Sequence, residues 1–319
     1  MTVQQQFQTL QDLAGASDLI RRSWLENKDQ TLDYNPEFLA SCYAYPGTDP
    51  ELSPAIYDDR GQLIAFVSAF PRRVVWDGRF LRLALLTFFT VAPEAKGRGL
   101  GKAVWAECLE RARAGGYDGA IHYCVDGNKS NFVTVAAARS MGLTCERVFT
   151  VKYLMRPLEP RKVESESAGA GSAEKLFREL AAELPSKARF RRSWNEDEIH
   201  WNCSERYGAV TEVHTSGRGL LTGYLLDTVG NPSVGCLLIE DLLWDGLAPK
   251  EQSDLLTQML DHASVNAQIA VAPLWGYSGA ETLVKAGFRR STRAMHVYLT
   301  VWNDMDLSYP PLPMYIDVF

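Results

Sequence analysis

The chain has 319 residues, which is enough for two ordinary domains, and its 46% hydrophobic and 23% charged residues are typical of a globular protein. The formal net charge of −6 argues against a general nucleic-acid or membrane-surface binder, because no basic excess neutralises phosphates. The six cysteines are scattered, and neither a leader-like N-terminus nor a membrane-length apolar run of roughly 20 residues is present. We therefore expect a cytoplasmic protein with reduced thiols.

One segment interrupts the globular texture. Residues 159–174 read EPRKVESESAGAGSAE, with almost nothing to bury, and this composition predicts a linker. The expected organisation is a first domain at 1–158, the linker at 159–174 and a second domain at 175–319.

The first half predicts two helices, a three-strand antiparallel meander and an alternation of helices and strands. Asp77-Gly78 is the strongest hairpin signal, and Gly142 ends a helix. In chain order we expect helices at 8–24 and 36–44, strands at 54–57, 63–70 with 74–76, and 80–91, a helix at 102–114, a strand at 120–125, a helix at 131–141 and a closing strand at 148–155.

The second half repeats this order, and a repeated architecture accounts for the whole length. Here we expect helices at 173–184 and 195–201, strands at 220–228 and 234–244, a helix at 249–265, a strand at 269–272, a helix at 279–286 and a last strand at 294–302.

The segment most informative about chemistry is a glycine-rich turn, KGRGLG, between the strand at 80–91 and the helix that follows. Glycines let backbone N–H groups approach a pyrophosphate, and a helix N-terminus adds oriented donors and partial positive charge. Lys96, Arg98 and Lys102 add charged side chains. The pattern predicts an anion-binding loop.

Other glycine-rich loops fit less well. A P-loop needs G-x-x-x-x-G-K-[ST], and no Ser or Thr follows Lys102. A dinucleotide fingerprint needs G-x-G-x-x-G in a parallel βαβ unit, whereas this loop follows an antiparallel meander. A plain strand-to-helix turn with solvated basic residues remains an alternative.

A strand is followed by V-x-P-E and then by K-x-x-G-x-G at the start of a helix. This order resembles motif A of the GNAT acetyltransferase superfamily, with Lys96 at the usual Gln or Arg position. The resemblance covers about residues 18–155. It implies an α+β (mixed α/β) fold of two tandem GNAT-like domains, each a twisted, mostly antiparallel sheet flanked by helices. It also implies acetyl-CoA or another acyl-CoA as co-substrate, bound by the loop, by the splayed strand before it and by an Asn eleven residues before Gly142. The residues so implicated are Phe89, Val91, Lys96, Gly97, Arg98, Gly99, Leu100, Gly101, Lys102, Ala103 and Asn131.

The chain departs from the family at its usual proton donor, because Ala138 stands where a tyrosine is common. His122 and Tyr123, on the preceding strand, are the candidates near the thioester, since an imidazole can accept a proton from an amine. A hydrogen-bonded structural role for His122 stays open. Cys124 is expected to be a packed thiol, and no metal site is expected.

The second half resembles a degenerate GNAT domain, since Asp245-Gly246 replaces the glycine-rich loop. We therefore expect one CoA site, in the first half. Glu240, beside Asp241 in an apolar strand, is a candidate to orient the acceptor, with an exposed strand edge as the alternative.

Three further segments have weaker signals. For the run Arg189 to Arg192 we expect a solvated face, with recognition of an acidic group as the alternative. For four aromatic residues we expect core packing, with the lining of a pocket as the alternative: Tyr224, Trp244, Trp275 and Tyr277. Protein N-myristoyltransferases also pair two GNAT-like halves and use their C-terminal carboxylate as base, which makes Phe319 a further possibility.

The function expected first is acyl transfer, most simply of acetyl, from acyl-CoA to an amine of a small molecule or peptide. Two alternatives remain open: a non-catalytic acyl-CoA sensor, and an acyltransferase whose donor is an acyl carrier protein.

Overall fold

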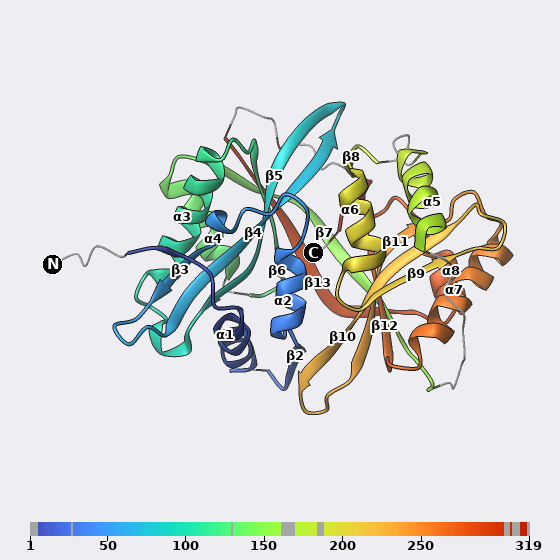
Figure 1. The fold of residues 1–319 in the computed structure, drawn as a ribbon, viewed down its shortest axis with the longest axis horizontal. Coiled ribbons are helices and arrows are strands. Elements are labelled where there is room, and N and C mark those ends of the chain that lie inside the picture. Colours follow the sequence, from blue (N-terminus) through green and yellow to red (C-terminus); the bar gives the residue numbers. More distant parts are fainter. Residues whose placement is uncertain are drawn as a thin grey trace.

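The computed structural model describes residues 6–26, 28–128, 130–160, 170–183, 188–302, 307 and 313–317. These residues form a mixed α/β fold around one large mixed sheet with helices on its faces (Figure 1). The expected fold class is confirmed. The main strand order is β1-β3-β4-β5-β6-β13-β7-β12-β11-β10-β2, with β8, β9 and β14 pairing off this path.

The first half contains the elements that its sequence predicts, with two differences. The helix expected at 8–24 begins only at Leu13, after a short strand at Gln8–Thr9, and a second short strand forms at Gln30–Leu32. Helix α2 begins where Asn35 accepts a hydrogen bond from the Phe38 N–H, and the β4–β5 turn has positive φ at Asp77 and Gly78. The elements are β1 (Gln8–Thr9), α1 (Leu13–Leu25), β2 (Gln30–Leu32), α2 (Pro36–Tyr43), β3 (Pro54–Tyr57), β4 (Leu63–Trp76), β5 (Arg79–Val91), α3 (Leu100–Ala114), β6 (Gly119–Val125), α4 (Ser130–Ser140) and β7 (Thr144–Pro157).

The second half repeats the pattern, with a three-strand antiparallel unit β9-β10-β11 in the place of β3-β4-β5. Its first helix starts at Ala170, so the last residues of the expected linker belong to α5. The elements are α5 (Ala170–Glu183), β8 (Phe190–Arg192), α6 (Glu196–His200), β9 (Ala209–Val213), β10 (Leu220–Gly230), β11 (Gly235–Leu243), α7 (Pro249–Ala263), β12 (Ile269–Leu274), α8 (Glu281–Lys285), β13 (Arg289–Val301) and β14 (Met314–Tyr315).

The closing strands of the two halves exchange places. Strand β13, from the second half, pairs antiparallel with β6, while β7, from the first half, pairs with β12. β13 and β7 also pair with each other and cross the middle of the molecule as the red and light green strands of Figure 1. Local sequence patterns predicted both strands but not this pairing, which joins the two halves into one sheet.

The C-terminal segment enters the same central region. β14 pairs with β8, and β8 pairs with β4, so the tail and the start of the second half extend the first-half sheet. The described tail residues 313–317 therefore lie beside the start of the second half, next to the first-half sheet.

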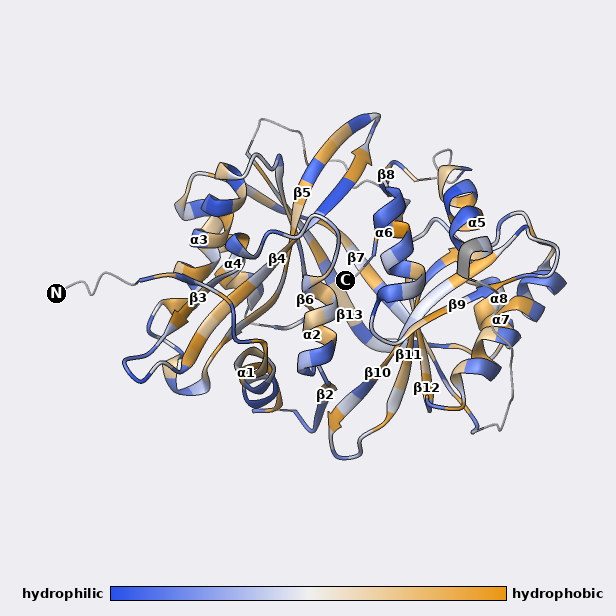
Figure 2. Ribbon diagram, viewed as in Figure 1, coloured by the Kyte–Doolittle hydropathy of each residue, from blue (hydrophilic) through white to orange (hydrophobic). Residues whose placement is uncertain are grey.

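Apolar side chains fill two clusters, and each cluster draws residues from both halves. Tyr224 and Leu226 of β10 join the first-half cluster, while Val74, Leu83 and Ile121 join the second. Figure 2 shows hydrophobic residues along the central strands, whereas the outward parts of several helices are hydrophilic. In the described part of the chain, no helix has both the length and the apolar character needed to cross a membrane.

Candidate active site

Strands β5 and β6 separate at the expected position. Their parallel ladder runs from Leu83 and Gly119 to Leu86 and His122, and none is formed beyond. β5 nevertheless continues to Val91, and β6 to Val125. The diverging ends leave a wedge between two strands whose carboxyl ends point to the same edge of the sheet.

A bulge accompanies the separation. The β4–β5 register shifts between Phe66 and Ser68, and Phe88 has a positive φ of 53°. After the bulge, the side chains of Phe89 and Val91 lie against Gly101. A Cβ on that glycine would come 3.0 Å from Phe89 Cζ and 3.3 Å from Val91 Cγ2. The strand therefore packs directly on the first turn of α3.

The glycine-rich loop exposes its backbone. Gly97 and Gly99 have φ values of 78° and 80°, and no heavy atom lies within 4 Å of a Cβ built on either. Positive φ favours glycine, and the open space leaves the amides reachable from solvent. Gly99 is the N-cap of α3, and no side chain caps that helix. Its first-turn N–H groups are thus available to an anion.

Basic side chains surround this turn. Arg98 and Lys102 are exposed, whereas Lys96 forms an ion pair with Glu26 at the end of α1. The exposed pair adds positive charge beside the helix terminus, which favours negative charge. The geometry and charge together suit a phosphate or pyrophosphate.

His122 lies on the last rung of the β5–β6 ladder and is buried. Its Nε2 is 3.1 Å from Thr134 Oγ1, and its ring stacks on Tyr298 at 5.0 Å and contacts Trp105 edge-on at 4.8 Å. Burial lowers the pKa of His122 to about 3. The imidazole is therefore neutral at physiological pH.

Tyr123 points to the opposite face of the sheet, because successive strand residues alternate. Its hydroxyl donates to the backbone carbonyl of Asp317 at 2.8 Å, and burial raises the pKa of the phenol well above its ordinary value. Tyr123 follows His122 on β6, just beyond the last β5–β6 pair, so the two side chains lie on opposite faces of the sheet where the wedge begins.

The tail residue Asp317 is held by two buried arginines. Its carboxylate is 2.9 Å from Arg72 Nε and also pairs with Arg192, whose side chain is fully buried. Burial by itself disfavours the carboxylate, but Arg192 and Arg72 outweigh it and hold the pKa of Asp317 below its ordinary value. The expectation of a solvated face over Arg189 to Arg192 is wrong for Arg192, because β8 lies between β4 and the tail.

Glu240 and Asp241 are both buried, so the exposed-edge alternative is wrong. Both oxygens of Glu240 accept hydrogen bonds from Arg206, and burial raises the pKa of this carboxyl while Arg206 opposes the rise. Burial also raises the pKa of Asp241, which accepts from the Tyr315 hydroxyl at 2.7 Å. These groups form a polar layer between the halves, near Asp317.

The sequence indicated two positions on α4, Asn131 and Ala138. The Asn131 amide donates to the Val125 carbonyl at 3.4 Å, and its buried Oδ1 has no partner among the described residues. Ala138 is fully buried and offers no proton donor. Cys124 is a buried free thiol, as expected. Phe319 lies outside the described residues.

The corresponding region of the second half is closed. The β11–β12 ladder ends at Leu238 and Val271, so these strands also diverge, but the Tyr277 hydroxyl accepts a hydrogen bond from the Leu242 N–H at 3.0 Å. At the start of α7, Glu251 accepts from the Ala248 N–H at 2.7 Å. The protein's own side chains satisfy donors here. Tyr224, Trp244, Trp275 and Tyr277 are all buried, which confirms their core packing.

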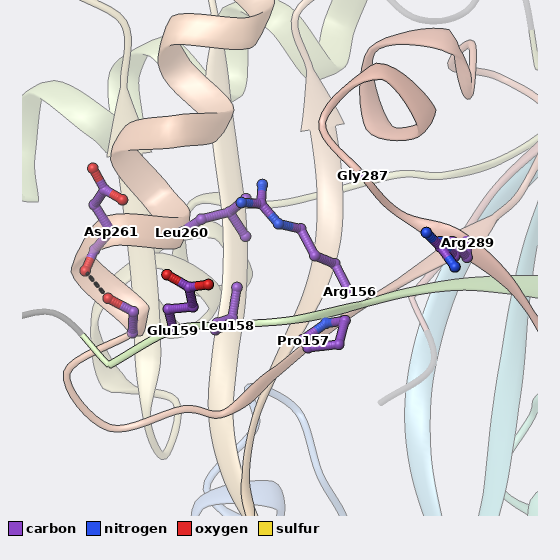
Figure 3. A pocket seen from close by; sticks show the side chains of 9 residues that line it. Arg156, Pro157, Leu158, Glu159, Leu260, Asp261, Gly287 and Arg289 are labelled. Atoms are coloured by element: carbon purple, nitrogen blue, oxygen red, sulfur yellow. Dashed lines mark hydrogen bonds between the residues drawn. The ribbon is translucent and has the colours of Figure 1, made fainter.

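A separate hollow of about 520 Å³ lies elsewhere, at the amino end of β12 and the last turn of α7. Figure 3 shows Arg156, Glu159 and Asp261 around it, at the edge opposite the wedge between β11 and β12. It therefore adds nothing to the loop region. Within the described residues, no group of three or more His, Cys, Asp or Glu side chains is arranged to hold a metal ion.

Residues 16–143 match the model of the acetyltransferase (GNAT) family, and this part of the chain belongs to that family. The resemblance read from the loop is confirmed. A sequence search among curated proteins gives no match.

Solved structures share the fold over nearly the whole chain. Saccharomyces cerevisiae N-myristoyltransferase with bound myristoyl-CoA is 14% identical, with a TM-score of 0.71 over 94% of this chain and 83% of that chain. A second structure of that enzyme with myristoyl-CoA gives a TM-score of 0.74 at 14% identity, over 97% of this chain and 81% of that one. A probable N-acyltransferase from Enterococcus faecalis is 12% identical, with a TM-score of 0.52 over 93% and 72% of the two chains. At these identities the likeness is one of fold.

Proposed function

We propose that this protein is an N-acyltransferase that moves an acyl group from acyl-CoA to an amine of a small molecule or peptide. The observation that carries the proposal is the uncapped first turn of α3, preceded by open glycines and bordered by a strand that has left its neighbour. The backbone N–H groups from Arg98 to Ala103 would bind the CoA pyrophosphate. The donor site thus lies in the first half alone.

The rest of the donor would follow the wedge between β5 and β6. The pantetheine arm has amides that can pair with the β5 backbone near Phe89 and Val91. The unpartnered Oδ1 of Asn131 offers one more acceptor at the start of α4. The thioester would then reach the rung at His122, between the two faces of the sheet.

The reaction proposed is direct transfer. The amine nitrogen attacks the thioester carbonyl, the C–N bond forms, the C–S bond breaks, and CoA leaves as a thiolate. The amine loses a proton, for which neutral His122 is our candidate acceptor, and the thiolate gains one, for which the protonated Tyr123 hydroxyl is our candidate donor. Burial raises the pKa of Tyr123 well above its ordinary value, so its hydroxyl carries its proton at physiological pH.

The second half would complete the acceptor cleft rather than bind CoA. We propose that Glu240, held by Arg206 in the polar layer between the halves, shapes this cleft and orients the acceptor. In this scheme residues 1–158 carry the donor, residues 175–319 help to hold the acceptor, and the segment between them connects the two.

Release of free CoA from acyl-CoA tests the proposal. A thiol assay would follow acyl donors from acetyl to myristoyl with a panel of small amines and peptides bearing a free N-terminus. We expect acceptor-dependent release with at least one pair, and the preferred donor identifies the acyl length. Tight acyl-CoA binding without turnover on any acceptor would contradict the enzyme and favour a sensor.

The sensor alternative has its own support. Ala138 supplies no proton donor, and an imidazole with a pKa of about 3 is a weak base. An acyl carrier protein as donor makes a different prediction, since it offers pantetheine without adenosine. Turnover with an acylated carrier protein and negligible binding of free acyl-CoA would identify that donor.

A further inference from the structure

A large aromatic side chain stands in the open at the start of α4. Phe132 is 78% exposed, whereas Thr134, two residues later, is buried against the sheet. Residues two apart on a helix point in nearly opposite directions, so the phenyl ring faces solvent. Burying a phenylalanine gains about 1.5–3 kcal/mol, so a flat ligand that covers the ring would bind favourably.

The start of α4 lies at the same edge of the sheet as the glycine-rich loop. β5 and β6 run parallel, so the helices that follow them, α3 and α4, both begin at the carboxyl edge. His122 contacts both helices. Its ring centroid is 4.8 Å from that of Trp105 on α3, and its Nε2 is 3.1 Å from Thr134 Oγ1 on α4. Phe132 therefore lies on the helix that begins at the same edge of the sheet as the first turn of α3.

A second feature beside Phe132 also indicates a ligand. The adjacent residue, Asn131, has a buried Oδ1 without a partner among the described residues, and Val125, which accepts from its amide, is 43% exposed. Phe132 therefore directly follows the residue whose Oδ1 we propose for the pantetheine arm, and a flat ring that covers Phe132 would belong to the same donor.

We propose that Phe132 is the platform on which the adenine ring of the CoA donor stacks. This inference rests on the proposed function, because it takes the pyrophosphate to be bound at Gly99 and Leu100. The adenosine then extends from the loop toward α4, and its base covers the phenyl ring. Stacking on an aromatic side chain is worth about 1–3 kcal/mol per base, so the ring contributes about tenfold or more to affinity.

The test compares two donors by isothermal titration. Acetyl-CoA carries the adenosine, and acetyl-4′-phosphopantetheine lacks it. We expect Phe132→Ala to weaken acetyl-CoA about tenfold and to leave acetyl-4′-phosphopantetheine unchanged, while Phe132→Trp retains the native affinity for both. Phe80→Ala is the matched control, because Phe80 is 77% exposed but lies at the opposite end of β5.

The possible results distinguish the stacking role of Phe132 from the proposed acyl-CoA site itself. An unchanged acetyl-CoA affinity in Phe132→Ala, or an equal loss for both donors, would overturn the stacking role. A native chain that binds no acetyl-CoA would contradict the proposed function, and with it this inference. Thermal melting of each variant checks the fold, which we expect to be unaffected because both rings are exposed.

Discussion

Helices α3 and α7 hold corresponding places in the two halves, but the capping of their N-termini differs. α3 starts from Gly99 with no side-chain cap, while α7 starts with Pro249 and has the Glu251 carboxylate bound to the Ala248 N–H. Glu251 also pairs with Arg218 at 2.8 Å. One helix end is left for an external anion, and the other is occupied by an anion of the chain itself.

The strands that precede these helices differ in the same sense. β5 leaves β6 after Leu86 and its wedge stays open, whereas the wedge beside β11 is filled by Tyr277. In our proposal the same fold therefore supports a ligand site in one half and a closed, structural version in the other. What distinguishes them is a few side chains at the loop and in the wedge, not the order of the elements.

Reversing the charge at the open helix should have the largest effect. In Arg98→Glu/Lys102→Glu, two charge-assisted contacts of roughly 1.5 kcal/mol each are lost, so we expect acyl-CoA to bind about 100-fold more weakly. Lys250→Glu reverses one charge at the start of α7 and should leave the affinity unchanged. Titration calorimetry measures the affinity of both variants for acyl-CoA. An equal loss of affinity in the two would contradict the claim that only α3 binds the ligand.

Adding one methyl group to the first turn of α3 should have a smaller effect. The Cβ in Gly101→Ala would lie 3.0 Å from Phe89 Cζ, which forces the ring into the space beside the strand. We expect about tenfold weaker binding of acyl-CoA, equal to about 1.4 kcal/mol. Gly246→Ala, in the second half, is the control. Native affinity in Gly101→Ala would mean that Phe89 does not border the ligand.

Opening the closed wedge should affect stability instead of binding. Tyr277→Phe removes the hydroxyl that accepts from the buried Leu242 N–H, and an unsatisfied buried donor costs about 1–3 kcal/mol. We expect a lower midpoint in chemical denaturation with an unchanged affinity for acyl-CoA. A change in affinity without a change in stability would indicate that the second half binds the ligand.

The self-capping carboxylate should give the smallest effect, visible only through its pH dependence. The Ala248 N–H and Arg218 hold the pKa of Glu251 below its ordinary value, so its contribution to stability is complete above the unfolded pKa of about 4.3. That contribution disappears as the pH falls through the lower, folded pKa. Glu251→Gln should therefore melt below the native chain at neutral pH and match it in acid. A constant difference at every pH would exclude the carboxylate as its cause.

The sequence predicted the longer elements and the loop because both depend on local signals, whereas the strands β1, β2, β8, β9 and β14 were missed. Periodicity located β5 and α3, and the glycines with positive φ were recognisable from their spacing. The exchange of β7 and β13 was not predictable, because alternation identifies a strand and says nothing of its partner. The burial of Arg192 was missed for the same reason, since it depends on the pairing of β8 with β4 and the tail.

Some features of the second half could be predicted from the sequence and some could not. Glu251 stands three residues after Ala248 and follows Pro249, which is a recognisable helix-start pattern, and it explains why that helix end is closed. The bond from the Leu242 N–H to Tyr277 joins residues far apart in sequence, so only the fold reveals it. His122 and Tyr123 were candidates from sequence, but their placement on opposite faces gives them different surroundings.

The stoichiometry of acyl-CoA binding tests the central claim most directly. Calorimetric titration of the native chain should give one acyl-CoA per chain, and that binding should be lost in Arg98→Glu/Lys102→Glu and kept in Lys250→Glu. Two molecules per chain, or binding that survives the double change at α3 and disappears on the change at α7, would contradict a single donor site in the first half.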